Sequence, residues 1–284
     1  MNLGQMRLRS SPSRVNLRWF HWRFHSFLSP ISVILGHRIG RVLHGVGSYS
    51  LFMAKGLGAS RESLRHLPII FRQMVQLGVN STPVVIMASV FAGVVFTLQT
   101  AYQLENSFLP PDTIGAVVVP TLILEMAALT PGLVLASRIG ASIAAELGTM
   151  KVTEQVDALE AMGLNSIAYL VIPRILAGIV MFPCMYVASA MISIAGGAIG
   201  GEVMGYLSVE SFILGAKTWF VPFDAFFGLS KSLVFGFLIT SIACWKGLTT
   251  SGGADGVGKA TTEAVVIACV NILIADYIMA EVIL

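Results

Sequence analysis

Three charged side chains stand inside long apolar segments of the sequence: Glu125, Lys231 and Asp276. An ionised group near the middle of a membrane span costs about 2.5 to 3.5 kcal/mol on insertion scales, so it pairs with an opposite charge or faces a polar path. The chemistry expected of these residues is therefore an ion pair, a carboxylate that faces a cavity, or a path for an ion or proton.

Residue counting places the three charges at a similar depth. Each charge lies 13 to 15 residues along its segment from the charged residue at the predicted cytosolic end. At about 1.5 Å per residue, this is a depth of roughly 20 Å. The segments that hold Lys231 and Asp276 form an antiparallel hairpin, so we predict an ion pair between them and leave Glu125 to face the cavity. In the alternative, Lys231 snorkels outward and Asp276 needs no partner.

A glycine-rich stretch joins those two segments and imitates a phosphate-binding loop. Gly253, Gly258 and Lys259 have the G-x-x-x-x-G-K spacing of such loops. However, Ala260 stands where a magnesium-binding hydroxyl is required, and the preceding segment is apolar rather than a predicted strand. A tight turn is favoured over a nucleotide site. The glycines expected in this turn are Gly252, Gly253, Gly256 and Gly258.

A charged helix is predicted between Gly148 and Gly163, because glycine is common where helices end. One face of this helix is apolar. The other face carries Lys151, Glu154, Asp157 and Glu160. Periodicity alone leaves two interpretations open: a surface helix that rests on the bilayer or the bundle, or a docking element for a cytosolic partner.

The composition excludes a water-soluble globule. Of 284 residues, 55% are hydrophobic and 12% are charged, which is typical of an integral membrane protein. A helix needs about 20 apolar residues to cross the hydrocarbon layer, and we predict an all-α fold with five transmembrane helices. The spans are expected near 83–104, 113–137, 175–201, 225–246 and 263–284.

The distribution of Lys and Arg predicts the orientation. Residues 1–82 hold eleven of the eighteen, and the basic residues of the later connections alternate in a way that places the N-terminus in the cytosol and the C-terminus outside. Glycines at 196, 197, 200 and 201 allow close helix approach, either within the bundle, which we favour, or at a dimer seam.

Residues 1–66 form a basic N-terminal region, and residues 67–284 a membrane domain that holds the five expected spans. No acidic residue precedes Glu62, and two amphipathic helices, over 17–28 and 31–46, are expected to lie in the headgroup layer. An organellar transit peptide is the alternative, since it shares this composition. We expect no metal site from the histidines, all of which lie in this region, and no disulfide among the three cysteines.

Two loops carry a resemblance to a known family. The stretches SRIGASIAAELGTMKVTEQVDALEAMGLN (137–165) and GLSKSLVFGFLITSIACWKGLTTSGGADGVGKATTEAVV (228–266) resemble the MlaE/YrbE family, the permease subunits of ABC-type intermembrane phospholipid transporters. The likeness covers about residues 35–284. It implies a homodimer, a cytosolic ABC ATPase dimer that uses ATP and Mg, and an external lipid-binding subunit with an MCE domain.

The resemblance also implies roles for particular residues. The coupling helix of the family is matched by Thr153 together with Lys151, Glu154, Gln155, Asp157 and Glu160. A lipid cavity between two permeases would include Gln99, Tyr102 and Glu125. Many family members carry Arg-Glu-Leu-Gly-Pro where residues 124–128 read Leu-Glu-Met-Ala-Ala, so the carboxylate is retained and the arginine is missing.

The function predicted from the sequence is a non-catalytic permease that binds no cofactor itself and moves phospholipid between a bacterial inner membrane and an external carrier. A chloroplast inner envelope is the alternative location. The competing function is an ion-coupled secondary transporter or channel that uses Glu125, Lys231 and Asp276. A scaffold that only anchors other subunits is a third hypothesis, and it would tolerate the loss of Glu125.

Overall fold

The computed structural model describes residues 43–58, 67–104 and 110–283. The chain divides into two compact units, Met1–Leu51 and Phe52–Leu284. The described part of the first unit belongs to a helix over 43–58. The interfacial helix predicted over 17–28, and all but the last four residues of the one over 31–46, lie outside the described residues.

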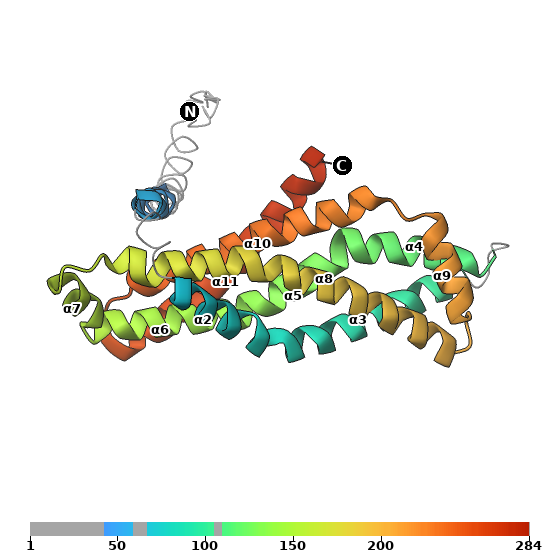
Figure 1. Ribbon diagram of the computed structural model, residues 1–284, viewed down its shortest axis with the longest axis horizontal. Helices are drawn as coiled ribbons and strands as arrows, with labels where there is room; N and C mark the ends of the chain where they lie inside the picture. Colours follow the sequence, from blue (N-terminus) through green and yellow to red (C-terminus); the bar gives the residue numbers. More distant parts are fainter. Residues whose placement is uncertain (1–42, 59–66, 105–109, 284) are drawn as a thin grey trace, which may run out of the picture. The chain divides into compact units, whose positions relative to one another are not determined.

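Helices make up all of the regular structure in the described residues (Figure 1). Five runs are long and apolar enough to cross a membrane, which confirms the predicted all-α fold with five spans. Two short helices, α7 (Gln155–Ala161) and α9 (Val209–Thr218), lie between runs. The first run consists of α2 (Leu67–Leu77), the 3-10 turn η1 (Val79–Ser81) and α3 (Thr82–Leu104). The second consists of α4 (Asp112–Thr121), η2 (Leu122–Met126), α5 (Ala127–Leu135), η3 (Ala136–Gly140) and α6 (Ala141–Val152). The third consists of η4 (Ile167–Val171) and α8 (Ile172–Val203), the fourth is α10 (Pro222–Leu248), and the fifth is α11 (Gly253–Ile283).

The helical runs are longer than the predicted spans. They contain 27 to 41 residues, whereas about 20 suffice to cross the hydrocarbon layer. The second predicted span ended just before Arg138, but helix hydrogen bonds are local and continue past such a residue. The second run, for example, passes Arg138 and Glu146 and ends at Val152.

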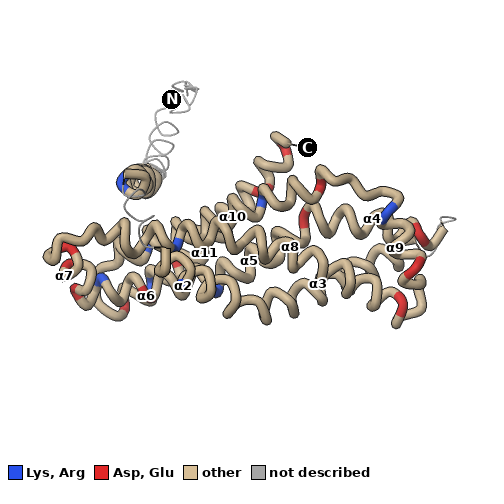
Figure 2. Tube along the Cα trace, viewed as in Figure 1, with Lys and Arg blue, Asp and Glu red and all other residues tan. Residues whose placement is uncertain are grey.

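Charged residues gather toward the two ends of the second unit, near α7 and near α9, and are sparse along the helices between them (Figure 2). These regions are called the α7 end and the α9 end below. An apolar middle between two charged ends is the pattern of a bundle that crosses a bilayer.

Small residues let α3 and α8 pack at very short range. A Cβ atom on Gly93 would lie 1.9 Å from the Ser193 carbonyl oxygen, and one on Gly197 would lie 2.5 Å from Thr97 Oγ1. The Ser89 and Ser189 hydroxyls meet across the same seam at 2.8 Å. The glycines near 196–201 therefore serve packing within one chain, the first of the two predicted alternatives.

Three of the turns within the helical runs, η2, η3 and η4, are π-helical. No feature of the sequence considered above predicts these π turns. Side-chain hydrogen bonds accompany each of them. In η3, Arg138 donates to the Asn80 carbonyl oxygen at 2.9 Å, and in η4 the Leu170 carbonyl oxygen accepts from Arg174 at 2.6 Å. Arg174 is buried and also forms an ion pair with Glu146 at 2.7 Å. Since π turns occur often at functional sites, the turn η2, which contains Glu125, is a candidate part of the functional site.

Candidate functional site

The three intramembrane charges meet in one cluster. Lys231 on α10 is fully buried. Its Nζ donates a hydrogen bond to Glu125 Oε1 at 2.6 Å and lies 2.9 Å from Asp276 Oδ1. The same ammonium group stands 4.6 Å from the centre of the Phe227 ring, a cation–π distance. One cation is thus shared by carboxylates from η2 and α11.

The position of Glu125 differs from the prediction. The predicted Lys231–Asp276 pair is present in the structure, but Glu125 is not left alone to face a cavity; it is the closer of the two partners of Lys231. Depth counting places residues along a helix axis and says nothing about rotation around it. The π turn that carries Glu125 adds a residue to one helical turn and so changes the direction in which the side chain points around the helix axis. The sequence did not predict this turn.

The cluster is open on its acidic side. The Lys231 side chain is 0% exposed, whereas those of Asp276 and Glu125 are 18% and 31% exposed. Asp276 Oδ1 is buried and receives no hydrogen bond within the described residues, although it is close to the ammonium group. The arrangement offers carboxylate oxygen at the surface of an otherwise apolar bundle and keeps the balancing cation inside.

At the α7 end, the predicted single helix is divided in two. Gly148 does not stop it: this residue is buried inside α6, where a Cβ atom would lie 3.1 Å from Thr250 Oγ1. The break comes instead at Glu154, whose φ of 61° lies in the left-handed region. Such a φ is uncommon for a residue with a Cβ atom. Gly163 has a φ of 80° and follows α7 as predicted for a helix stop.

The predicted coupling residues lie on both sides of this break. Lys151 at the end of α6 forms an ion pair with Asp157 of α7 at 2.7 Å. Glu160 accepts a hydrogen bond from Ser166 Oγ at 2.6 Å, and Gln155 Nε2 donates to Thr153 Oγ1 at 3.0 Å. The side chains of Glu154, Gln155, Asp157 and Glu160 are exposed. They form a compact polar tip.

The α10–α11 connection is a tight glycine turn, shorter than predicted. Gly252 and Gly253 have φ values of 92° and 70°, which favour glycine. Gly256 and Gly258 do not belong to the turn, because α11 begins at Gly253. A Cβ atom on Gly256 would lie 2.0 Å from the Ser251 carbonyl oxygen, so its role is close approach of the backbone.

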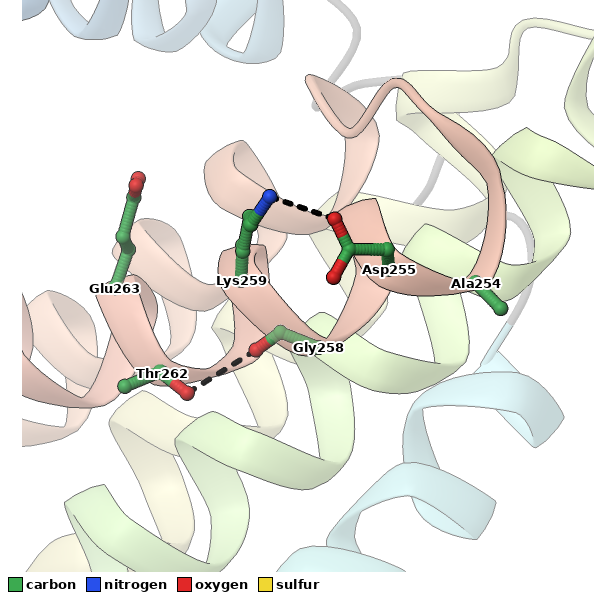
Figure 3. A pocket seen from close by; sticks show the side chains of 6 residues that line it. All are labelled: Ala254, Asp255, Gly258, Lys259, Thr262 and Glu263. Carbon is green, nitrogen blue, oxygen red and sulfur yellow. Dashed lines mark hydrogen bonds and ion pairs between the residues drawn. The ribbon is translucent and has the colours of Figure 1, made fainter.

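The surface beside this turn does not have the form of a phosphate-binding loop. A shallow hollow follows one face of α11, and its lining includes Gly258 and Lys259 (Figure 3). Both residues lie within the helix, where the N–H groups beyond the first turn are used in helix hydrogen bonds. Lys259 Nζ is bonded to Asp255 Oδ2 at 2.6 Å. The phosphate motif is therefore a coincidence of spacing. Among the described residues, no group of three or more His, Cys, Asp or Glu side chains is placed to hold a metal ion.

Comparison with known proteins assigns the family. A family model described as Permease MlaE matches residues 70–282. A probable ABC transporter permease protein of Rickettsia felis is 38% identical over 247 residues, which is 87% of this chain and 95% of the relative. A protein of the same description from Synechocystis is 38% identical over 207 residues, 73% of this chain and 78% of the relative. This chain belongs to the MlaE permease family.

A plant protein is also similar to this chain. The Arabidopsis thaliana protein TRIGALACTOSYLDIACYLGLYCEROL 1, chloroplastic, is 34% identical over 210 residues, 74% of this chain and 60% of the relative. As an ABC permease of the MlaE family, the chain is a membrane component of a transporter, and a permease of this class implies an ATPase partner.

The other two predicted cavity residues of this MlaE permease lie on a different element from Glu125. Gln99 and Tyr102 occupy the last two turns of α3, and both side chains are exposed, Tyr102 to 71%. A cavity between two permeases would be lined by residues that one copy exposes. Their role in such a cavity therefore stays a prediction.

Sequence reasoning missed the residue that supports the π turn beside Glu125. The Tyr186 hydroxyl donates to the Ile123 carbonyl oxygen at 3.0 Å. Two signals in the sequence indicate an irregular helix here: Pro120 and Pro131 lie on either side of η2, and a proline removes a helix hydrogen bond. Neither signal identifies the partner on α8.

Proposed function

We propose that this MlaE-family chain is the permease of an ABC transporter that moves phospholipid between a bacterial inner membrane and an external MCE-type carrier. Two copies would form the membrane unit, with two copies of a separate ATPase at the α7 end. In this proposal the α7 end faces the cytosol, and ATP and Mg act on the partner. The permease itself performs no hydrolysis.

The observation that carries this proposal is the half-open charged cluster on an apolar bundle. A phospholipid needs a polar contact for its headgroup and apolar surface for its acyl chains. Glu125 and Asp276 supply acceptor oxygens, and the exposed residues of the neighbouring helices are largely apolar. Because both carboxylates are partly exposed, the cluster suits the positively charged or hydrogen-bond-donating part of a headgroup.

The plant relative supports the lipid class. Its name contains a galactolipid built on diacylglycerol, so the name of at least one similar protein connects it with a glycerolipid. The share of this chain that matches it includes most of the permease domain.

The experiment is lipid transfer by the purified complex. The permease, its ATPase and the carrier are reconstituted in vesicles that contain fluorescent phospholipid, and ATP-dependent transfer is measured. Glu125→Gln keeps the shape of the side chain and removes its charge, so we expect about a tenfold loss of transfer. Glu210→Gln, an exposed position on α9, is the matched control and should transfer lipid at the parent rate. Equal rates for both variants would contradict the proposed role of the cluster.

A second candidate, ion-coupled transport, is favoured by the same cluster, since buried charges in spans often form ion or proton paths. The two functions differ in energy source. Vesicles that hold the permease without its ATPase are given a proton or sodium gradient. Transport under these conditions would favour the second candidate, and transport only with the ATPase and ATP the first.

A further inference from the structure

One tyrosine hydroxyl joins three elements next to the charged cluster. Tyr186 on α8 is 3% exposed. Its hydroxyl donates to the Ile123 carbonyl oxygen in η2 at 3.0 Å and lies 3.4 Å from the Ala225 carbonyl oxygen at the start of α10. Since η2 carries Glu125 and α10 carries Lys231, the hydroxyl is placed between the two elements whose charges pair.

The bond answers a need that the π turn creates. A π turn departs from the regular i to i−4 pattern of hydrogen bonds, so the carbonyl groups within it are poorly matched to the helix. In an apolar bundle, a carbonyl oxygen without a donor is costly. The Tyr186 hydroxyl supplies the donor to Ile123, two residues before Glu125.

Gly228 keeps the space for this bond. A Cβ atom at that position would lie 2.3 Å from the Tyr186 hydroxyl oxygen and 2.6 Å from the Ile123 carbonyl oxygen. Both distances are far too short, and the Ile123 oxygen belongs to the backbone. Lys231 follows Gly228 by three residues on the same helix, so one turn of α10 holds both the slot for the hydroxyl and the cation of the cluster.

We propose that Tyr186 is a positioning residue: its hydroxyl, in the slot left by Gly228, holds the π turn against α10 and so keeps Glu125 Oε1 within 2.6 Å of Lys231 Nζ. Without the bond, η2 is free to return to a regular helix. Losing one residue of register would rotate the carboxylate by about 100° around the helix axis. The importance of Tyr186 for transport rests on the proposed function, whereas its effect on the cluster does not.

The test is a double-mutant cycle between Tyr186→Phe and Glu125→Gln. Tyr186→Phe keeps the ring and removes only the hydroxyl. In the parent background, we expect it to lower the thermal unfolding midpoint of the purified permease and to reduce ATP-dependent lipid transfer about tenfold. In the Glu125→Gln background, the loss of the hydroxyl still leaves the Ile123 carbonyl oxygen without its donor, so the midpoint should fall by a smaller amount, and lipid transfer should fall no further. Tyr206→Phe, at an exposed position, is the matched control and should change nothing in either background.

A purely structural role gives a different result. If Tyr186→Phe lowers the unfolding midpoint equally in both backgrounds, the positioning role is overturned. Gly228→Ala is a second variant that keeps the hydroxyl and displaces it, and it should show the same dependence on Glu125. A parent complex that transfers no lipid would overturn the proposed function alone, because the unfolding cycle still decides the positioning role.

Discussion

Lys231 is the residue on which the charged cluster depends. It is 0% exposed and faces two carboxylates from different helices. Replacing a buried ion pair by well-packed apolar residues is often tolerated, but removing one partner leaves uncompensated charge in a low dielectric. The single cation of this cluster balances two carboxylates, so its removal is the most damaging change.

We therefore predict that Lys231→Met destabilises the protein by about 3 to 5 kcal/mol. The measured quantity is the free energy of unfolding in detergent. Adding Glu125→Gln and Asp276→Asn to this variant removes both unbalanced charges and should recover most of the loss. A triple variant that is less stable than Lys231→Met would show that packing around the lysine, and not its charge, holds the cluster together.

The α3–α8 seam shows how elements position the cluster. At Gly93 the two helices approach backbone to backbone, because a Cβ atom there would lie 1.9 Å from the Ser193 carbonyl oxygen. Since α8 also carries Tyr186, any displacement of α8 reaches the π turn that holds Glu125.

A pair of alanine substitutions tests this seam. Gly93→Ala places a Cβ atom 1.9 Å from the Ser193 carbonyl oxygen, so we expect a loss of about 2 kcal/mol or more in the free energy of unfolding. Gly258→Ala is the matched control: nothing lies within 4 Å of its Cβ position in α11, and alanine is the better helix former, by about 1 kcal/mol. Equal effects of both substitutions would show that α3 and α8 are not held at this short distance.

The α6–α7 tip is the element predicted to meet the ATPase. Its exposed carboxylates lie beyond the apolar part of the second run. Reversing charge with Glu154→Lys and Glu160→Lys should abolish lipid-stimulated ATP hydrolysis by the complex while the permease stays folded, because an interface that fits a negative tip repels a positive one. The control is the same reversal at Glu202 and Glu210, exposed residues near the α9 end. Loss of stimulation in the control and not in the test variant would place the ATPase at the α9 end.

At the scale of the whole molecule, the five runs differ in how much of their surface the chain itself covers. The most apolar part of α10 is the most buried of the five, at 56% of its residues, and that of α11 the least, at 11%. A helix so exposed faces lipid or a second copy. We predict that the purified complex contains two 30.3 kDa permease chains for every two ATPase chains, as measured by mass photometry in detergent. A complex with one permease would rule out a cavity between two copies.

Much of this protein follows from its sequence alone. Hydrophobic composition and segment length predicted a membrane protein with five spans, because the cost of apolar surface in water and the rise per residue of a helix hold for any helical segment. The same rise placed Glu125, Lys231 and Asp276 in one layer. The loop motifs predicted the MlaE family, which the comparisons confirm.

The tertiary structure decided how the helices turn toward one another. Rotation about a helix axis depends on packing with neighbours, so depth counting left Glu125 unpaired although it lies 2.6 Å from Lys231. The π turn η2, the Tyr186 hydroxyl that supports it and the slot at Gly228 come from three different elements. A local pattern describes one element at a time, and for that reason contacts that join three of them appear only when the chain is folded.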